Sequence, residues 1–336
     1  MTNPPEAPED TPIYSQVLTA LEEKGYRGRI VSIGRLRDIS AHIDRHRQAG
    51  SLDEEFDRDW LATFDFDVAA KHPDLKSIII VAVPQPHVRL SFESGQGTIT
   101  AVIPPTYSDK IDGYVTNVLQ DILVRGGFRL SRHRVPLKTV AACSGLAEYG
   151  KNNITYVEGM GSYCRLMAFC TDMPCDDYAW QEPREMEACR DCTACLKKCP
   201  TNAIADDRFL LRAERCITYH NESEGPFPEW IEPAWHHCLI GCLYCQAYCP
   251  VNHGVSRSVK TGPSFDLAET NLILKGVPAN SQPEATRLKL EEYGFYESLA
   301  DLTRNLSVLI EIPGNIERGL SFLPEKQGMG DSHGFR

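Results

Sequence analysis

The sequence predicts a mixed α/β domain followed by a smaller module that is rich in cysteines and turns. Strand-like and helix-like patterns alternate up to about residue 175, which is typical of α/β architecture. Cysteines then become dense, and helical patterns return only after Asn252. The expected segments are a disordered start at 1–12, an α/β domain at 13–178, a cysteine-rich module at 179–256, a helical segment packing on the core at 257–322 and a mobile tail at 323–336.

Hydrophobic periodicity predicts the individual elements in chain order. Ile13, Val17 and Leu21 share one face of a first helix, which ends at Gly25. The continuous β-branched run at 77–83 is short, which favours a buried strand over a helix. The other expected elements are strands at 29–33, 134–140 and 165–171, helices at 36–47, 109–125 and 283–293, and a hairpin or an irregular loop at 91–103.

Composition restricts the classes of function open to the chain. It has 336 residues, a formal net charge of −11 and no apolar run of the roughly 18–20 residues that span a bilayer. The acidic, proline-rich start does not look like a signal peptide, so we expect a cytoplasmic protein with no membrane association. Because an acidic chain repels phosphates, its charge argues against a nucleic-acid partner.

The first cysteine motif has the spacing of a bacterial ferredoxin. It reads C-x2-C-x2-C-x3-C-P and contains Cys189, Cys192, Cys195 and Cys199. The two-residue gaps let a tight turn present three thiolates to one cubane, while the fourth cysteine, before Pro200, points at another cluster. The motif therefore predicts two [4Fe–4S] clusters, which move electrons one at a time.

The second motif supplies three of the remaining ligands. It reads C-x2-C-x3-C-P and contains Cys242, Cys245 and Cys249. Cross-ligation of the ferredoxin type assigns one cluster to Cys189, Cys192, Cys195 and Cys249. The other cluster takes Cys199, Cys242, Cys245 and one further cysteine. On spacing alone, Cys216 and Cys238 compete for this last place.

Zinc is the main alternative, because C-x2-C pairs also bind zinc. A zinc site does not need the C-P signature, and two near-identical runs favour clusters. Disulfides are disfavoured in the cytoplasm, so thirteen cysteines in one chain indicate metal binding or chemistry. Four cysteines without mutual spacing are interpreted as packed core thiols: Cys143, Cys164, Cys170 and Cys175.

The region before the clusters is larger than electron transfer alone requires, which indicates a catalytic or cofactor-binding domain. Its stretch at 135–174 contains S-G-L-A-E-Y-G-K-N, then G-S, then T-D-M-P. This stretch resembles the shared core of the epoxyqueuosine reductases and the reductive dehalogenases. The segment 241–252 resembles G-C-D-D-C-Q-x-x-C-P-W-N of the former family, and Tyr107 with Asp112 matches its Y-x4-D pattern. The resemblance covers roughly residues 75–253.

The resemblance implies a nitroreductase-like domain that holds a base-off cobalamin above one cluster. Cys216 lies in a phrase similar to the family's R-C-I-S-Y, whose cysteine is a cluster ligand, and this favours Cys216 as the eighth ligand. A ferredoxin or flavodoxin would supply the electrons. The residues that match the motif lining the corrinoid are Gly150, Lys151, Asn152, Gly161 and Ser162.

Departures from the family pattern concern the substrate. The aspartate proposed as proton donor in epoxyqueuosine reductases is missing from 130–134, and Glu148 replaces a family tryptophan. Together with the acidic charge, these departures favour a small-molecule substrate other than epoxyqueuosine. Tyr107, His133 and Glu148 are then candidate proton donors, and Arg132 is a candidate anion-binding residue.

Two other functions fit the same motifs. The chain could be an electron-transfer protein that reduces a partner enzyme or its corrinoid. The missing aspartate is compatible with this function. It could also be a cytoplasmic reductive dehalogenase, which would release halide from an organohalide. Binding of cobalamin by the chain itself would distinguish the reductase from the electron-transfer protein.

Overall fold

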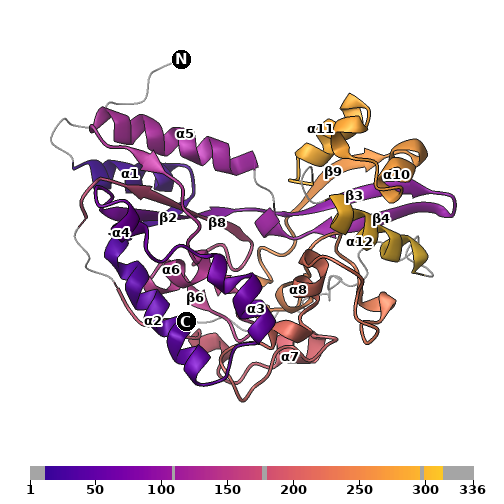
Figure 1. Cartoon of the computed structure of the whole chain (residues 1–336), viewed down its shortest axis with the longest axis horizontal. Helices are drawn as coiled ribbons and strands as arrows, with labels where there is room; N and C mark the ends of the chain where they lie inside the picture. Colours follow the sequence, from indigo (N-terminus) through magenta and orange to yellow (C-terminus); the bar gives the residue numbers. More distant parts are fainter. Residues whose placement is uncertain (1–11, 108–109, 176–179, 296–298, 313–336) are drawn as a thin grey trace, which may run out of the picture.

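The computed structural model describes residues 12–107, 110–175, 180–295 and 299–312 (Figure 1). The tail expected at 323–336 lies outside these residues, and so does the start expected to be disordered, apart from Pro12. Two lobes, each built around a β-sheet, stand side by side, and the cysteine-rich segment lies beneath them in Figure 1. The mixed α/β class is thereby confirmed.

The first sheet has four strands, and all neighbouring strands are antiparallel. Its order is β1, β2, β8 and β5. The strands expected at 29–33, 77–83 and 165–171 are confirmed as β1, β2 and β8, with ends shifted by one or two residues. The bounds are β1 at Arg27–Ser32, β2 at Ser77–Pro84, β8 at Cys164–Thr171 and β5 at Leu130–Ser131.

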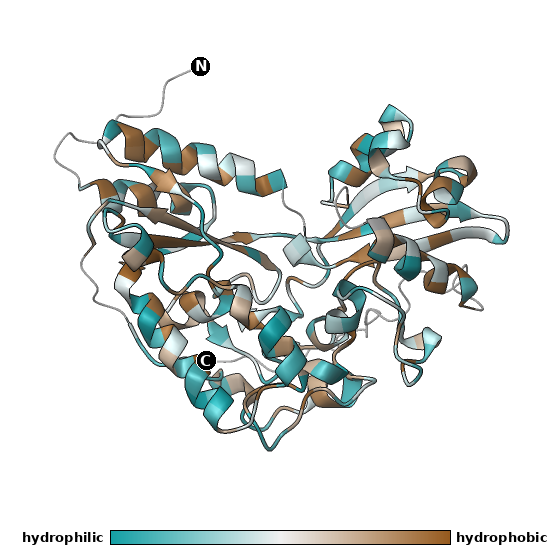
Figure 2. Ribbon diagram, viewed as in Figure 1, coloured by the Kyte–Doolittle hydropathy of each residue, from teal (hydrophilic) through white to brown (hydrophobic). Residues whose placement is uncertain are grey.

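Helices cover both faces of this sheet, so β2 is buried on both sides. Ile79 and Val81 pack with α1 (Ile13–Glu23) and α5 (Lys110–Arg125). The alternate residues Ile78 and Ile80 pack with α2 (Leu36–Gln48) and α6 (Leu137–Cys143). This arrangement explains why β2 reads as a continuous apolar run, and Figure 2 colours β2 and β8 as hydrophobic.

The strand expected at 134–140 is wrong, because most of this segment begins helix α6. Val135, Leu137 and Val140 suggested an extended segment, but Pro136 caps the helix. Proline is well tolerated next to a helix start because its missing N–H would be unpaired there anyway. The expected helices at 36–47 and 109–125 are confirmed as α2 and α5, although Asp109 is outside the described residues.

The second sheet joins segments that lie far apart in the sequence. β3 (His87–Ser94) and β4 (Gly97–Ile103) form a hairpin, which resolves the open alternative at 91–103. β9 (Val259–Phe265) pairs in parallel with β3 and was not expected within a helical segment. Its Gly262–Pro263 pair and exposed side chains hide the strand pattern, but an edge strand tolerates proline.

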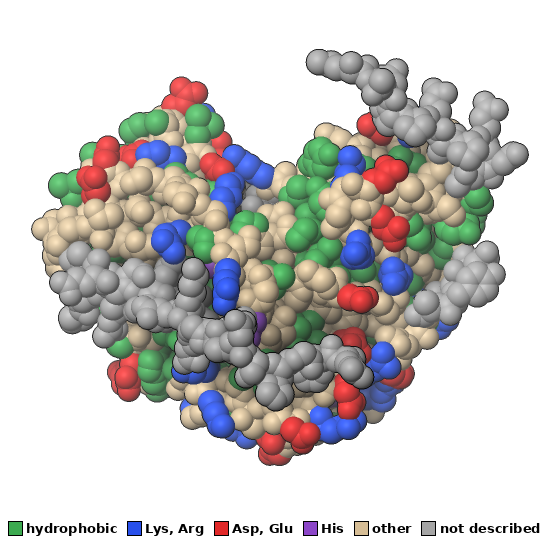
Figure 3. All heavy atoms as spheres, turned by 180° about the vertical axis from the view of Figure 1, so that it is seen from behind, with side chains coloured by type: hydrophobic (Ala, Val, Ile, Leu, Met, Phe, Trp, Pro, Cys, Tyr) green, Lys and Arg blue, Asp and Glu red, His purple; other side chains and the backbone are tan. Residues whose placement is uncertain are grey.

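Three helices complete this lobe. The expected helix at 283–293 is present as α11 (Glu284–Glu291), and α10 (Leu267–Leu274) and α12 (Leu299–Glu311) accompany it. Their apolar side chains share one core with β3, β4 and β9. None of the helices in the described ranges is long and apolar enough to cross a membrane. Figure 3 shows the hollow between the two lobes from behind.

The cysteine-rich segment contains only short helices. These are α7 (Ala194–Lys198), α8 (Ile217–Glu222) and α9 (Tyr244–Ala247), and α7 packs against α9. Between this segment and the first lobe lies the two-stranded sheet of β6 (Glu148–Tyr149) and β7 (Thr155–Tyr156). The remaining helices are α3 (Glu54–Asp59) and α4 (Val68–Lys71).

Candidate redox site

The structure gathers four cysteines of the first predicted cluster, which we call the first set: Cys189, Cys192, Cys195 and Cys249. Burial raises the pKa of the Cys189 thiol, and negative charge on Cys249 and Cys192 raises it further. Burial likewise raises the pKa of Cys195 to about 11, with added repulsion from Cys189, Cys249 and Cys192. Cys189 and Cys249 also pack in one cluster with Tyr156 and Met186, so the two motifs meet although they are far apart in sequence.

The second set is Cys199, Cys216, Cys242 and Cys245. Burial holds the pKa of Cys245 well above its usual range, and Cys242, Cys216 and Cys199 add repulsion. All four of these cysteines are partly accessible to water. Helix α7, which carries Cys195, packs against α9, which carries Cys245, so the two sets are neighbours.

The surroundings of Cys216 and Cys238 bear on the eighth ligand. Cys216 repels Cys245 and is itself repelled by Cys199, and the backbone amides of Thr218 and Tyr219 donate to its sulfur. Cys238 is buried in an apolar group with Val102, Tyr163 and Leu243, although it also repels Cys242. Cys216 is therefore the better placed of the two, and its assignment as a ligand stays a prediction.

The surroundings of the sulfurs include hydrogen-bond donors. Among the described residues, no three His, Cys, Asp or Glu side chains are placed to hold one metal ion. Backbone amides point at several of the sulfurs, including those from Lys151 to Cys189 and from Tyr244 to Cys242. Hydrogen bonds to sulfur are one of the means by which proteins set the potential of an iron–sulfur cluster.

The G-S motif fixes the second cysteine motif to the first lobe. The backbone N–H of Ser162 donates to Oδ1 of Asn252 at 2.9 Å, and Nδ2 of Asn252 donates to Ser162 Oγ at 2.8 Å. Ser162 Oγ also donates to Gln246 in α9 at 2.9 Å. Gly161 has φ +57°, and a Cβ there would lie 2.2 Å from Asn252 Oδ1, so only glycine permits this approach.

Asn152 also connects the first lobe to the second cysteine motif. Its Nδ2 donates to the Tyr156 hydroxyl at 3.0 Å and to the backbone oxygen of Cys245 at 3.4 Å. A Cβ on Gly150 would lie 2.6 Å from both Asn152 and Tyr156. The side chains of Asn152 and Ser162, which the resemblance assigns to a corrinoid site, therefore bind the second cysteine motif.

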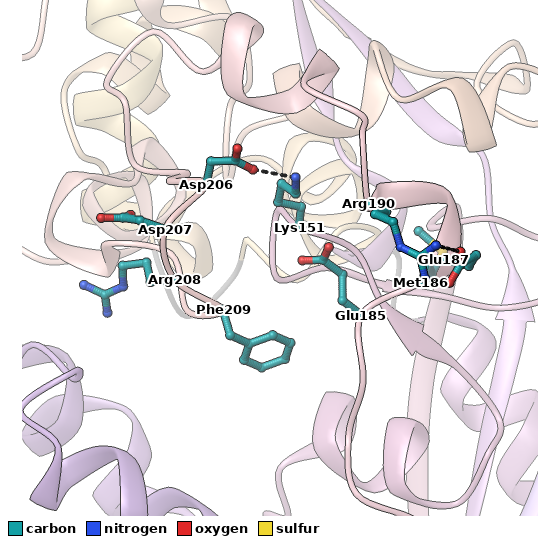
Figure 4. Close-up of a pocket in the computed structure, with 9 residues that line it drawn as sticks. All are labelled: Lys151, Glu185, Met186, Glu187, Arg190, Asp206, Asp207, Arg208 and Phe209. Carbon is teal, nitrogen blue, oxygen red and sulfur yellow. Dashed lines mark hydrogen bonds and ion pairs between the residues drawn. The ribbon is translucent and has the colours of Figure 1, made fainter.

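Lys151 lines a hollow of about 600 Å³ beside the first set (Figure 4). Its Nζ lies 2.5 Å from Asp206 Oδ1, and this ion pair raises the pKa of Lys151. Figure 4 shows Arg190 and Glu187 paired on the opposite side of the hollow from Lys151 and Asp206. Charged groups of both signs thus surround the first set.

A second group of polar side chains lies beside the second set. The Tyr107 hydroxyl donates to Glu222 at the end of α8. Burial raises the pKa of Glu222 to about 7, against the opposing effects of Tyr107 and Lys138. Gly241, next to Cys242, has φ +66°, and a Cβ there would lie 2.7 Å from the Tyr107 oxygen. Tyr107 therefore lies directly against the second cysteine motif.

Lys138 completes this group. Lys138 is exposed, burial by surrounding protein lowers its pKa, and its Nζ donates to the backbone oxygen of Asn153 at 3.4 Å. Negative charge on Cys216, Glu222 and Cys245 opposes this lowering. Sequence reasoning missed both Lys138 and Glu222, since neither belongs to a motif and only the fold brings them to Tyr107.

The structure does not bring the three candidate proton donors together. His133 contacts Ser131, with Nε2 3.2 Å from Oγ, and its ring centre lies 4.9 Å from that of His72. Glu148 accepts a hydrogen bond from exposed Arg184 at 3.0 Å. Only Tyr107 lies beside the second set. Arg132 donates to Asp112 at 3.0 Å, so this candidate anion-binding group already has a carboxylate partner.

Residues 188–252 match the family model of a 4Fe-4S double cluster binding domain. The chain contains such a domain. Its two sets of cysteines thus have the context that the motif spacing predicted, and the match favours iron–sulfur clusters over zinc.

Curated relatives are similar to this chain over part of their length. Epoxyqueuosine reductase of Lactococcus garvieae is 32% identical over 136 residues, which are 40% of this chain and 37% of that protein. The Pseudomonas aeruginosa enzyme of the same name is 35% identical over 129 residues, covering 38% of this chain and 35% of that protein. The matches therefore span little more than a third of these relatives, and the predicted resemblance to epoxyqueuosine reductases is confirmed.

A solved structure of Bacillus subtilis epoxyqueuosine reductase has a similar fold. Its TM-score is 0.61 at 20% identity, with 89% of this chain and 82% of that chain covered. A crystal structure of epoxyqueuosine reductase with a modified tRNA-Tyr stem loop gives the same TM-score at 19% identity, also with 89% and 82% covered. At this identity the likeness concerns the fold.

Proposed function

We propose that the chain is an iron–sulfur reductase in which electrons reach a substrate from the second set of cysteines. The observation that carries this proposal is the position of Tyr107, Glu222 and Lys138 beside that set. The first set lies near a charged hollow and would receive electrons one at a time. A ferredoxin or a flavodoxin is the proposed donor, in the cytoplasm.

Reduction of a substrate by two electrons consumes protons, and the side chains near the second set can deliver them. A group with a pKa near 7 is partly protonated at neutral pH, which suits a general acid. Glu222 has this property and accepts the hydrogen bond of Tyr107, so a proton lost by Tyr107 can be replaced from Glu222. The positive charge of Lys138 stabilises added electrons on a neighbouring cluster.

The resemblance to the two families implies a cobalamin between the second set and the substrate. When bound, it would supply a strongly reducing cobalt centre. The side chains present do not fit direct contacts to it as the resemblance implied, because Asn152 and Ser162 already bind the second cysteine motif. Lys151 is likewise paired with Asp206. We therefore derive no step through cobalamin and assign these residues to holding the clusters in place.

Different observations favour two different classes of substrate. The missing aspartate in 130–134 favours a small molecule other than epoxyqueuosine. The relatives' name and the structure solved with a tRNA stem loop favour epoxyqueuosine in tRNA, and with it a nucleic-acid partner. The sequence-based argument against nucleic acid rests on net charge alone and is not supported by this comparison.

Anaerobic purification with iron and cobalt analysis tests the proposed function. The proposal predicts about eight irons per chain and conversion of an epoxyqueuosine stem loop only if tRNA is the substrate. Cobalt retained after incubation with cobalamin would show that the chain also binds the corrinoid. Reduced clusters with no bound corrinoid and no turnover would instead support an electron-transfer protein. Fewer than two clusters per chain would contradict the proposal.

A further inference from the structure

A cavity of about 200 Å³ adjoins Glu222 and is separate from the hollow beside the first set. The second lobe contributes α12 and Phe295 to its wall, and the cysteine-rich segment contributes α8 and the residues before Gly241. Trp60, next to α3, closes one side. Most of the wall is apolar, and its polar members are few.

The free polar atoms of this cavity are hydrogen-bond acceptors. Asn221 is 1% exposed and uses its Nδ2 to donate to Gly241 O at 2.7 Å, while its Oδ1 has no partner among the described residues. Nδ2 of Asn305 is bound to the backbone oxygens of Asn221 and Leu239 at 2.9 Å. The remaining polar members are the carboxyl groups of Glu222 and Asp301.

Arg304 is the nearby cation, but it does not donate a hydrogen bond to Asn221 Oδ1. Arg304 lies on α12 close to Asp301 and opposes the rise in its pKa that burial causes. However, the guanidinium of Arg304 donates to Asn305 Oδ1 at 2.9 and 3.0 Å and to backbone oxygens at the end of α8, and it stacks on Phe227 with a centroid distance of 4.1 Å. Arg304 thus satisfies the acceptor of Asn305, while Asn221 Oδ1 still has no partner among the described residues.

We propose that this cavity binds a small, mostly apolar molecule with a hydrogen-bond-donating cationic head, such as a primary ammonium group. A buried acceptor without a partner is costly, and an ammonium supplies three donors and a charge that two carboxylates stabilise. The apolar wall, with Trp60 and Phe295, holds the body of the molecule. Glu222 connects the cavity to Tyr107, so as a substrate pocket it rests on the proposed reductase function.

Binding can be tested without electron transfer, on oxidised, cluster-loaded protein at pH 8. The probes are benzylamine, benzyl alcohol and benzoate, which share a ring and differ in the charge of the head. Isothermal titration should show binding in the order benzylamine, benzyl alcohol, benzoate. Quenching of tryptophan fluorescence by benzylamine should disappear in Trp60→Phe if the ring occupies this cavity.

Two variants test the site itself. Asp301→Asn removes one carboxylate with little change of shape and should weaken benzylamine about tenfold. Glu311→Gln makes the same charge change at an exposed position of the same helix and should leave binding unaltered. Ile240→Phe fills the cavity and should abolish binding of all three probes.

The outcomes separate this inference from the proposed function. Benzoate binding as well as benzylamine, benzylamine binding unaffected by Asp301→Asn and Ile240→Phe, or no binding of any probe would overturn it. Binding as predicted by a protein that lacks reductase activity would leave the cavity assigned and remove only its role as a substrate pocket.

Discussion

The two sets of cysteines share a motif but differ in what surrounds them. The first set lies near opposed ion pairs, Lys151–Asp206 and Arg190–Glu187, beside a hollow of about 600 Å³. The second set lies beside Tyr107, Glu222 and Lys138. Equal spacing in the sequence thus encodes similar ligand positions, while the rest of the fold places ion pairs near one set and proton donors beside the other.

The largest expected effect comes from removing a ligand of the second set. Cys216→Ala should lower the iron content from about eight to about four per chain, because a cubane that lacks one thiolate is lost during purification. Cys238→Ala should retain both clusters, since Cys238 belongs to an apolar group. Iron analysis and EPR of the reduced proteins would check this. The opposite pattern would make Cys238 the eighth ligand.

A smaller effect is expected where the first lobe holds the second motif. Asn252→Ala deletes three hydrogen bonds of a fully buried side chain and leaves Ser162 N without its partner. We expect a loss of about 2–4 kcal/mol in the free energy of unfolding, measured by anaerobic denaturant titration. The exposed Asn280→Ala variant is the control and should change stability by less than about 0.5 kcal/mol. Equal stability of both variants would refute the role of this contact.

Glu222, which lies beside the second set, should make the free energy of unfolding depend on pH. Its pKa is about 7 in the folded protein and near its ordinary value of 4.5 when unfolded. Between these values the folded state binds more protons, so its contribution to stability is largest at low pH and is lost as pH rises to about 7. Glu222→Gln should reduce the loss of stability between pH 5 and pH 8 by about 2 kcal/mol.

The measurement compares denaturation of wild type and variant at both pH values, because cluster lability affects both proteins alike. Exposed Glu229→Gln serves as the matched control and should retain the wild-type pH dependence. If Glu222→Gln also retains it, Glu222 does not titrate in this range and is not the proton reservoir of Tyr107.

The sequence predicted local features well because local spacing determines them. The motif spacing identifies candidate ligands, and the apolar runs at 77–83 and 165–171 identify strands buried on both faces. Contacts between distant segments were not predictable. Glu222 and Lys138 have no motif, and β9 contains Gly262 and Pro263, which obscure an edge strand. The contacts of the G-S motif were not predictable either, because the partners of Ser162, Gln246 and Asn252, lie 84 and 90 residues away.

The most direct test of the account is a pair of redox titrations on lysine variants, followed by EPR. Lys138→Gln removes a positive charge near the second set, and Lys151→Gln removes one near the first. Loss of a nearby positive charge lowers the potential of a cluster. Each variant should therefore lower the potential of one cluster, a different one in each case, and leave the other close to wild type. Equal shifts of both clusters in both variants, or no shift in either, would contradict the assignment of two distinct environments.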